Sequence, residues 1–167
     1  MTVKFNKVQC VGNEEKYLLE ALRSGKWSGR GPKTLELESL AEKECQAKHA
    51  FFVTSCSTAL ELSCLLANLK PGDEVIMPSF GFVSEGNAAV MRGAKPVFAD
   101  VDLKTWNMSR ATVEGLITKK TKAILTVHYA GSTAGIEDLR TLARERGLFL
   151  IEDAAQSLGA KRSGKPI

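Results

Sequence analysis

The sequence lacks the features of several protein classes. Its longest apolar runs, Ala123–Val127 and Leu148–Ile151, are far shorter than the ~20 residues of a membrane-spanning helix. The first residues show no apolar stretch typical of a signal peptide, so we expect a cytoplasmic protein with no membrane partner. Four cysteines and two histidines without a Cys-x-x-Cys pair argue against a zinc site and favour reduced thiols.

A strong excess of charge of one sign is also missing. The 23 Lys and Arg residues exceed the 19 Asp and Glu residues by only four. The densest basic stretch is Lys161–Lys165, whereas a nucleic-acid-binding protein usually shows a sharper basic stripe, so we expect no nucleic-acid partner. With 44% hydrophobic residues over 167 positions, the composition predicts a folded chain with a buried core.

Short apolar segments alternate with segments of helical pattern. Strands are expected at Ala50–Val53, Glu74–Met77, Pro96–Ala99, Lys122–Val127 and Leu148–Ile151. Helices are expected at residues 13–24, 34–47, 57–69, 83–92, 109–117 and 135–146. This alternation predicts the α/β class, with a mostly parallel sheet between two helical layers, a three-layer α/β/α arrangement.

Several common nucleotide and hydrolase motifs are absent. The chain contains no P-loop pattern and no Gly-x-Ser-x-Gly elbow. Gly29 and Gly31 resemble part of a dinucleotide fingerprint, but the third glycine is missing and no strand precedes them. Ligands of open α/β sheets bind outside the carboxyl ends of the strands, so the residues that follow each expected strand are the candidates for a site.

Three such positions suggest chemistry. Thr54–Leu60 opens a helix with small hydroxyl residues, which suits either a phosphate or a simple N-cap. Glu152 and Asp153 would point to opposite faces of a strand. One of them could therefore be structural, and the other could pair with a pyridinium nitrogen. The alternative is that these residues are a helix N-cap or surface acids. Phe82 could stack on a flat cofactor or belong to the core, and His128 is expected to be a hydrogen-bonded structural residue. A phosphate site, a ring and a carboxylate at one edge fit a pyridoxal phosphate pocket.

The chain resembles the N-terminal part of a sugar-nucleotide aminotransferase of the DegT/DnrJ type, a branch of the fold type I pyridoxal phosphate (PLP) enzymes. The segments that carry this resemblance are Ser24–Pro32, Thr54–Glu61, Pro71–Ser84, Arg92–Asp100, Val127–Gly131 and Ile151–Gln156. They lie in the order and at the spacing typical of the family. The resemblance implies an incomplete large domain of that fold, with residues 1–48 as a helical segment with a substrate loop and residues 49–167 as a partial PLP-binding domain. A small C-terminal domain is expected to be absent.

The resemblance also implies a role for individual residues. The residues expected to bind pyridoxal 5'-phosphate are Cys56, Ser57, Thr58, Phe82, Asp153 and Gln156. The first three would hold the phosphate, Phe82 would stack on the ring, Asp153 would pair with the ring nitrogen and Gln156 would contact the phenolic oxygen. The residues expected near the sugar-nucleotide entrance are Ser28, Gly29 and Gly31.

One feature of the family is missing from the sequence. The family's Schiff-base lysine lies farther along the chain than this sequence extends, and Lys161 and Lys165 are too close to Asp153 to replace it. We therefore expect no catalytic residue in this chain and a truncated form that is inactive alone, which leaves open whether it acts as an enzyme.

The implied activity is a transamination of a nucleotide-linked sugar. With glutamate as the donor, TDP-4-keto-6-deoxyglucose would give TDP-4-amino-4,6-dideoxygalactose, a sugar for lipopolysaccharide and enterobacterial common antigen, and the full-length form would be a homodimer. Two alternatives remain open. One is a non-catalytic module that binds a phosphate or a partner subunit, and the other is a related PLP-dependent sugar dehydratase.

Overall fold

The computed structural model describes residues 7–167, which divide into two compact units between Phe52 and Val53. The first unit contains two helices, α1 (Glu14–Arg23) and α2 (Pro32–Cys45). Proline suits the first position of α2 because its ring fixes φ and the N–H that it lacks has no helical partner there. The helix ends where Gln46 adopts the left-handed conformation with φ 52°.

The strand expected at Ala50–Val53 is wrong. This segment is extended but pairs with no strand among the described residues. Its backbone is held by carboxylates of α2 instead, because the Ala50 N–H donates to Glu42 Oε1 at 3.1 Å and the Phe52 N–H donates to Glu38 Oε1 at 3.2 Å. Side-chain acceptors therefore satisfy backbone donors that a neighbouring strand would otherwise satisfy.

The second unit is built on a parallel sheet. Its strands are β1 (Glu74–Pro78), β2 (Lys95–Ala99), β3 (Thr121–Val127) and β4 (Phe149–Asp153). They lie in the order β2-β1-β3-β4, and each neighbouring pair is parallel. The main helices are α3 (Cys56–Leu66), α4 (Val83–Met91), α5 (Arg110–Val113) and α6 (Ile136–Arg146). The 3-10 turns η1 (Glu114–Leu116) and η2 (Tyr129–Gly131) follow α5 and β3, so the helix expected at 109–117 is a short α-helix continued by a 3-10 turn.

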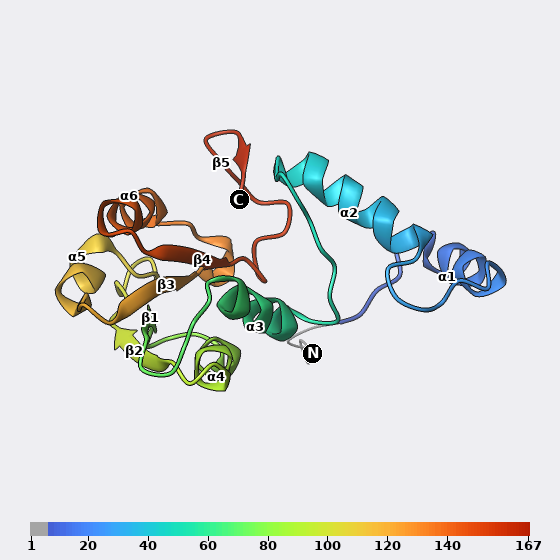
Figure 1. Cartoon of the computed structure of the whole chain (residues 1–167). Helices are drawn as coiled ribbons and strands as arrows, with labels where there is room; N and C mark the ends of the chain where they lie inside the picture. Colours follow the sequence, from blue (N-terminus) through green and yellow to red (C-terminus); the bar gives the residue numbers. More distant parts are fainter. Residues whose placement is uncertain (1–6) are drawn as a thin grey trace. The chain divides into compact units, whose positions relative to one another are not determined.

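Helices cover both faces of this sheet, and the two-residue period of the strands divides its side chains between two cores (Figure 1). On one face, Val75 of β1 and Leu125 of β3 pack with residues of α3 and α4. On the other face, Ile76 and Ile124 pack with residues of α5 and α6, among them Leu139. The three-layer α/β/α fold with a mostly parallel sheet is thereby confirmed.

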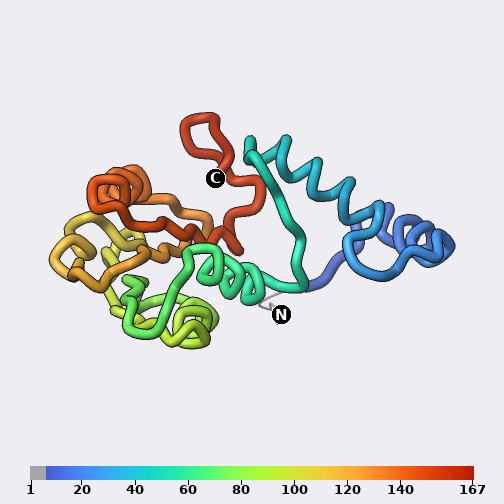
Figure 2. Tube along the Cα trace, in the orientation of Figure 1, coloured from blue at the N-terminus to red at the C-terminus, as the bar shows by residue number. Residues whose placement is uncertain are grey.

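The connections change face between β1 and β3. The α4 crossover from β1 to β2 lies on one face, whereas α5 and α6 lie on the other. Neighbouring strands β1 and β3 therefore leave a crevice at their carboxyl ends, which is where ligands of such sheets bind. Beyond β4 the chain leaves the sheet and closes the short hairpin β5 (Lys161–Arg162) and β6 (Lys165–Pro166), red in Figure 2. None of the helices described is both long enough and apolar enough to span a bilayer.

The two-sided core makes the central strand the most sensitive part of the sheet. Leu125 of β3 is 0% exposed, whereas Leu103 in a surface turn is 89% exposed. Leu125→Ala should lower the free energy of unfolding by about 2–5 kcal/mol because it leaves a cavity in a packed core. The matched control, Leu103→Ala, should change it by less than about 0.5 kcal/mol. Urea unfolding of both variants checks this, and equal losses would contradict the core assignment.

Candidate active site

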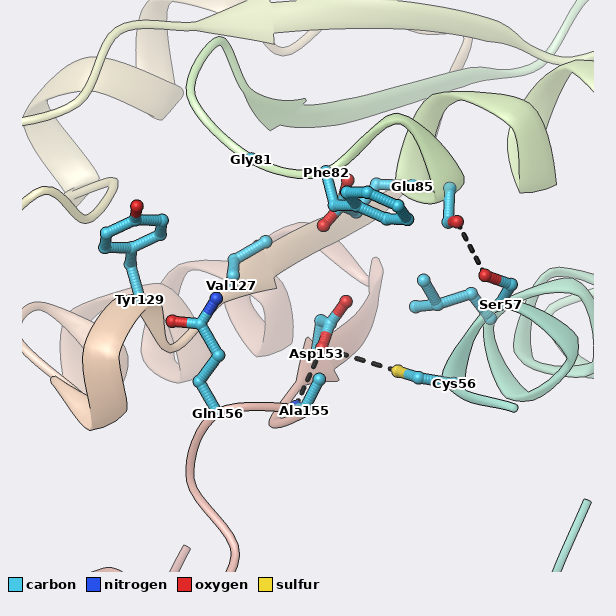
Figure 3. Close-up of a pocket in the computed structure, with 12 residues that line it drawn as sticks. Cys56, Ser57, Gly81, Phe82, Glu85, Val127, Tyr129, Asp153, Ala155 and Gln156 are labelled. Atoms are coloured by element: carbon cyan, nitrogen blue, oxygen red, sulfur yellow. Dashed lines mark hydrogen bonds between the residues drawn. The ribbon is translucent and has the colours of Figure 1, made fainter. Parts of the chain in front are cut away.

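A cavity of about 420 Å³ lies at the carboxyl ends of β3 and β4, beside the beginnings of α3 and α4 (Figure 3). Five of the six residues expected to bind the cofactor line it, namely Cys56, Ser57, Phe82, Asp153 and Gln156. They come from separate parts of the chain, and the topology of the sheet brings them together. The remaining expected residue, Thr58, is not among the lining residues.

Asp153 is a buried carboxylate in the wall of this cavity. It ends β4 with 6% of its surface exposed. Its Oδ1 accepts hydrogen bonds from the Ala155 N–H at 2.9 Å and from the Cys56 thiol, whose Sγ is 3.6 Å away. Both bonds go to one oxygen, so the other keeps its lone pairs for the cavity (Figure 3). Burial and the neighbouring Asp153 carboxylate raise the pKa of Cys56 to about 11, so this thiol stays a donor at neutral pH.

Glu152 points to the opposite face and has a structural role. Its carboxylate accepts hydrogen bonds from Arg140 of α6, with Nη2 to Oε1 at 3.0 Å, and lies 2.9 Å from His128 Nε2. Burial alone would raise the pKa of Glu152, but the His128 hydrogen bond and the Arg140 charge outweigh it and lower that pKa. His128 is 2% exposed and hydrogen-bonded, as expected of a structural histidine.

The beginning of α3 offers backbone donors to the cavity region. Ser55 is the N-cap, and its Oγ accepts the Thr58 N–H at 3.2 Å. Within the described part of the chain, no acceptor takes the N–H groups of Cys56 or Ser57. The Ser57 hydroxyl lies 2.6 Å from the Ser84 hydroxyl across the cavity wall. A helix start with free N–H groups and hydroxyls suits an anion.

The Thr58 side chain lies away from the cavity and helps to shape the helix start. Its Oγ1 is 3.1 Å from Ser55 Oγ and 3.3 Å from Thr54 Oγ1. These hydroxyls form a local network of the kind that serine and threonine build at helix starts. The direct cofactor contact assigned to Thr58 from the resemblance therefore stays a prediction.

Aromatic and amide side chains complete the cavity wall. Phe82 is 70% exposed and its ring overhangs the cavity in Figure 3. Gln156 Oε1 accepts the Ala130 N–H at 2.6 Å, which fixes the amide at the opposite rim. Tyr129 lines the cavity and stacks with Trp106, with ring centroids 5.8 Å apart. Flat, rigid walls of this kind suit a planar ligand.

The residues expected to contact the sugar nucleotide lie in the first unit. Gly29 and Gly31 line a cavity of about 410 Å³ in that unit, beside Trp27, whereas Ser28 does not line it. Gly29 has φ +62°, a conformation that disfavours any other residue. The assignment of these three residues to the substrate stays a prediction.

Sequence reasoning assigned no role to several lining residues, and the one among them with a buried acidic side chain is Glu85. It is 4% exposed and lines the wall beside Asp153. A signal was available, because Glu85 lies three and four residues before Ala88 and Ala89, the small apolar residues of the same helix that face the core. Among residues 7–167 no lysine lines the cavity, and Lys165 lines a separate cavity with His128 and Arg140.

The chain belongs to the DegT/DnrJ/EryC1/StrS aminotransferase family, whose model matches residues 9–167. It is 41% identical over 148 residues to the UDP-4-amino-4-deoxy-L-arabinose–oxoglutarate aminotransferase of Shewanella sediminis, covering 89% of this chain and 38% of that relative. It is 38% identical over 154 residues to GDP-perosamine synthase of Caulobacter vibrioides, covering 92% of this chain and 42% of that relative. The chain therefore spans about two fifths of the length of these curated relatives.

Solved structures with the same fold support the family assignment. The match to 3-amino-5-hydroxybenzoic acid synthase has a TM-score of 0.91 and 36% identity, over 95% of this chain and 42% of that one. NtdA of Bacillus subtilis with bound cofactor PMP matches with a TM-score of 0.84 and 31% identity, over 90% and 34%. DesI in the presence of its TDP-sugar product matches with a TM-score of 0.84 and 35% identity, over 91% and 38%. PMP is the pyridoxamine form of PLP, so the cofactor expected from the sequence is confirmed for the family.

The Arg140–Glu152 ion pair generates a prediction about pH. The pKa of Glu152 is lowered below its ordinary value of 4.5, so the pair stabilises the fold above that pH, and this contribution is lost as the pH falls through the lowered pKa. Arg140→Gln should therefore cost about 1 kcal/mol of unfolding free energy at about pH 7 and much less at about pH 3.

Urea unfolding at both pH values measures this difference. Arg144→Gln is the matched control, since Arg144 is an exposed arginine of the same helix with no carboxylate partner among the residues described. A loss that is the same at both pH values would show that Arg140 acts through packing alone.

Proposed function

We propose that this chain forms the cofactor-binding part of a PLP-dependent aminotransferase that acts on a nucleotide-linked keto sugar. The observation that carries the proposal is the buried Asp153 carboxylate, held at one oxygen by Cys56 and Ala155 and open to the cavity at the other. Membership of the aminotransferase family supports it, as do relatives whose names describe amino sugars.

The cavity suits PLP in size, charge and shape. Its volume of about 420 Å³ lies within the range of small-ligand sites, which is about 300–1,000 Å³. The Asp153 carboxylate in its wall suits a pyridinium nitrogen, and the free N–H groups of Cys56 and Ser57 offer donors to a phosphate. The exposed ring of Phe82 supplies a flat surface for stacking.

Each side chain then has a distinct task. Bound PLP supplies an electron sink for the transfer of an amino group. Asp153 would accept a hydrogen bond from the protonated ring nitrogen and hold the proton there, since an ionised carboxylate favours the pyridinium form. The start of α3 would neutralise the phosphate, Phe82 would hold the ring in plane, and Gln156 would orient the opposite edge.

The finer proposal concerns the substrate. We take it to be TDP-4-keto-6-deoxyglucose, converted to TDP-4-amino-4,6-dideoxygalactose with glutamate as the amino donor. A nucleotide-linked amino sugar as the product is supported by two relatives named for GDP- and UDP-linked sugars. A structural neighbour with a TDP-sugar product supports it as well. Amination by a full-length homodimer containing this chain, with the TDP-, UDP- and GDP-linked keto sugars compared, tests the nucleotide. Preference for GDP or UDP would overturn the TDP assignment and leave the cofactor assignment standing.

The cofactor site can be tested on this chain directly with PMP, which forms no Schiff base with surface lysines. Asp153→Asn should weaken PMP binding by about 10–100-fold, because an amide cannot replace a charge-assisted hydrogen bond to the pyridinium. Calorimetric titration measures the affinity, and Asp138→Asn, at an exposed acid on α6, serves as the control. If inorganic phosphate binds but Asp153→Asn leaves PMP binding unchanged, the chain is a phosphate-binding module.

The position of the lysines gives a second test. Because neither Lys161 nor Lys165 is among the described residues that line the cavity, PLP followed by borohydride should give no stoichiometric label on either lysine. Peptide mapping by mass spectrometry identifies any labelled residue. The chain with PLP, glutamate and the nucleotide-linked keto sugar should likewise produce no amino sugar. Specific labelling of either lysine, or turnover by the isolated chain, would contradict the assignment.

A further inference from the structure

The cavity contains a second buried carboxyl group that the proposed transamination does not use. Glu85, in the first turn of α4, is 4% exposed and lines the same cavity as Asp153, which is 6% exposed (Figure 3). The position where a Cβ on Gly81 would lie is 3.4 Å from both Glu85 carboxyl oxygens. This carboxyl therefore packs against the loop that precedes α4.

No cation compensates these two acids from within the cavity. Among the described residues that line it there is no lysine, arginine or histidine. The other titratable side chains that face it are the Cys56 thiol from α3, whose raised pKa keeps it neutral, and the Tyr129 phenol from η2. Two ionised carboxylates in one buried, cation-free cavity would repel each other and lose hydration, so the pair retains a proton.

The surroundings decide which acid carries that proton. Asp153 Oδ1 already accepts two hydrogen bonds, from the Cys56 thiol and the Ala155 N–H. Burial raises the pKa of Glu85, and the nearby Asp153 carboxylate raises it further. Backbone N–H groups at Phe82 and Glu85 oppose this, but the net direction is upward.

We propose that Glu85 is a positioning residue that stays a neutral carboxylic acid and donates its proton in a hydrogen bond to the Asp153 carboxylate. The pair then holds one proton and one negative charge, which matches the single positive charge of a protonated pyridine nitrogen. The role of the Glu85–Asp153 pair in cofactor binding rests on the proposed function, whereas the protonation of this pair is a property of the ligand-free chain.

The proton can be detected by infrared spectroscopy of the ligand-free chain. A protonated carboxyl band should be present at about pH 7 and should shift when the protein is labelled with ¹³C-glutamate, because it belongs to a glutamic acid. Glu85→Gln should remove the band, and Asp138→Asn should leave it. Asp153→Asn should let the band titrate at a lower pH, because the neighbouring charge is gone. Absence of the band at about pH 7, or a band that ¹³C-glutamate does not shift, would overturn the proposal.

The effect on the site is tested by PMP binding to folded variants, whose melting curves are compared first. Glu85→Ala should weaken PMP binding by about tenfold, because Asp153 loses a donor, and Glu85→Gln should recover most of this loss, because its amide still donates. Equal losses in the two variants would overturn the positioning role. If the wild-type chain shows the glutamic acid band but binds no PMP, the proposed function fails while the shared proton stands.

Discussion

The alternation of side chains along one strand, β4, is the constraint on which the site depends. Because successive residues of a strand point to opposite faces, the side chains of Glu152 and Asp153 have different partners and different roles. Glu152 faces α6 and ties that helix to the sheet through Arg140 and His128. Asp153 faces α3 and α4 and enters the cavity. A slip of one residue in the register of β4 would exchange these roles and leave a charge without its partners.

The same strand end brings the two halves of the site together. Cys56, at the start of α3, donates to Asp153 across 97 residues of sequence, so the end of the cavity proposed for the phosphate is fixed to the end proposed for the ring. Substitutions at one end of the cavity should therefore change the geometry of the other end. The switch of connections between β1 and β3 opens the crevice in which this happens, and the loop after β1 contributes Phe82 from above.

Much of this arrangement was predictable because it depends on local patterns. The spacing of apolar residues along the chain predicted the strands β1 to β4 and every main helix. The adjacent acids at 152 and 153 predicted one structural and one ligand-binding carboxylate on opposite faces of the sheet. The strand at Ala50–Val53 was wrong because its apolar residues look like a strand, whereas its hydrogen-bond partners are the Glu38 and Glu42 side chains of α2. No pattern within the segment shows that its donors are satisfied in this way.

The parts of the site that could not be predicted depend on contacts between distant segments. The spacing of Glu85 from Ala88 and Ala89 indicates the buried side of α4, but only the fold shows that its carboxyl group lines the cavity with Asp153. Membership of the family indicates the cofactor, but it does not indicate a second carboxyl group in the wall, which comes from the geometry of this chain.

The central claim is that Asp153 holds a proton on the ring nitrogen of the bound cofactor. The ¹⁵N chemical shift of PMP labelled at that nitrogen measures this protonation directly in the complex with the chain. The account predicts the shift of a protonated, hydrogen-bonded pyridinium in the wild-type chain, and a change toward the neutral pyridine value in Asp153→Asn. A neutral pyridine shift in the wild-type complex, or a shift that Asp153→Asn leaves unchanged, would contradict it.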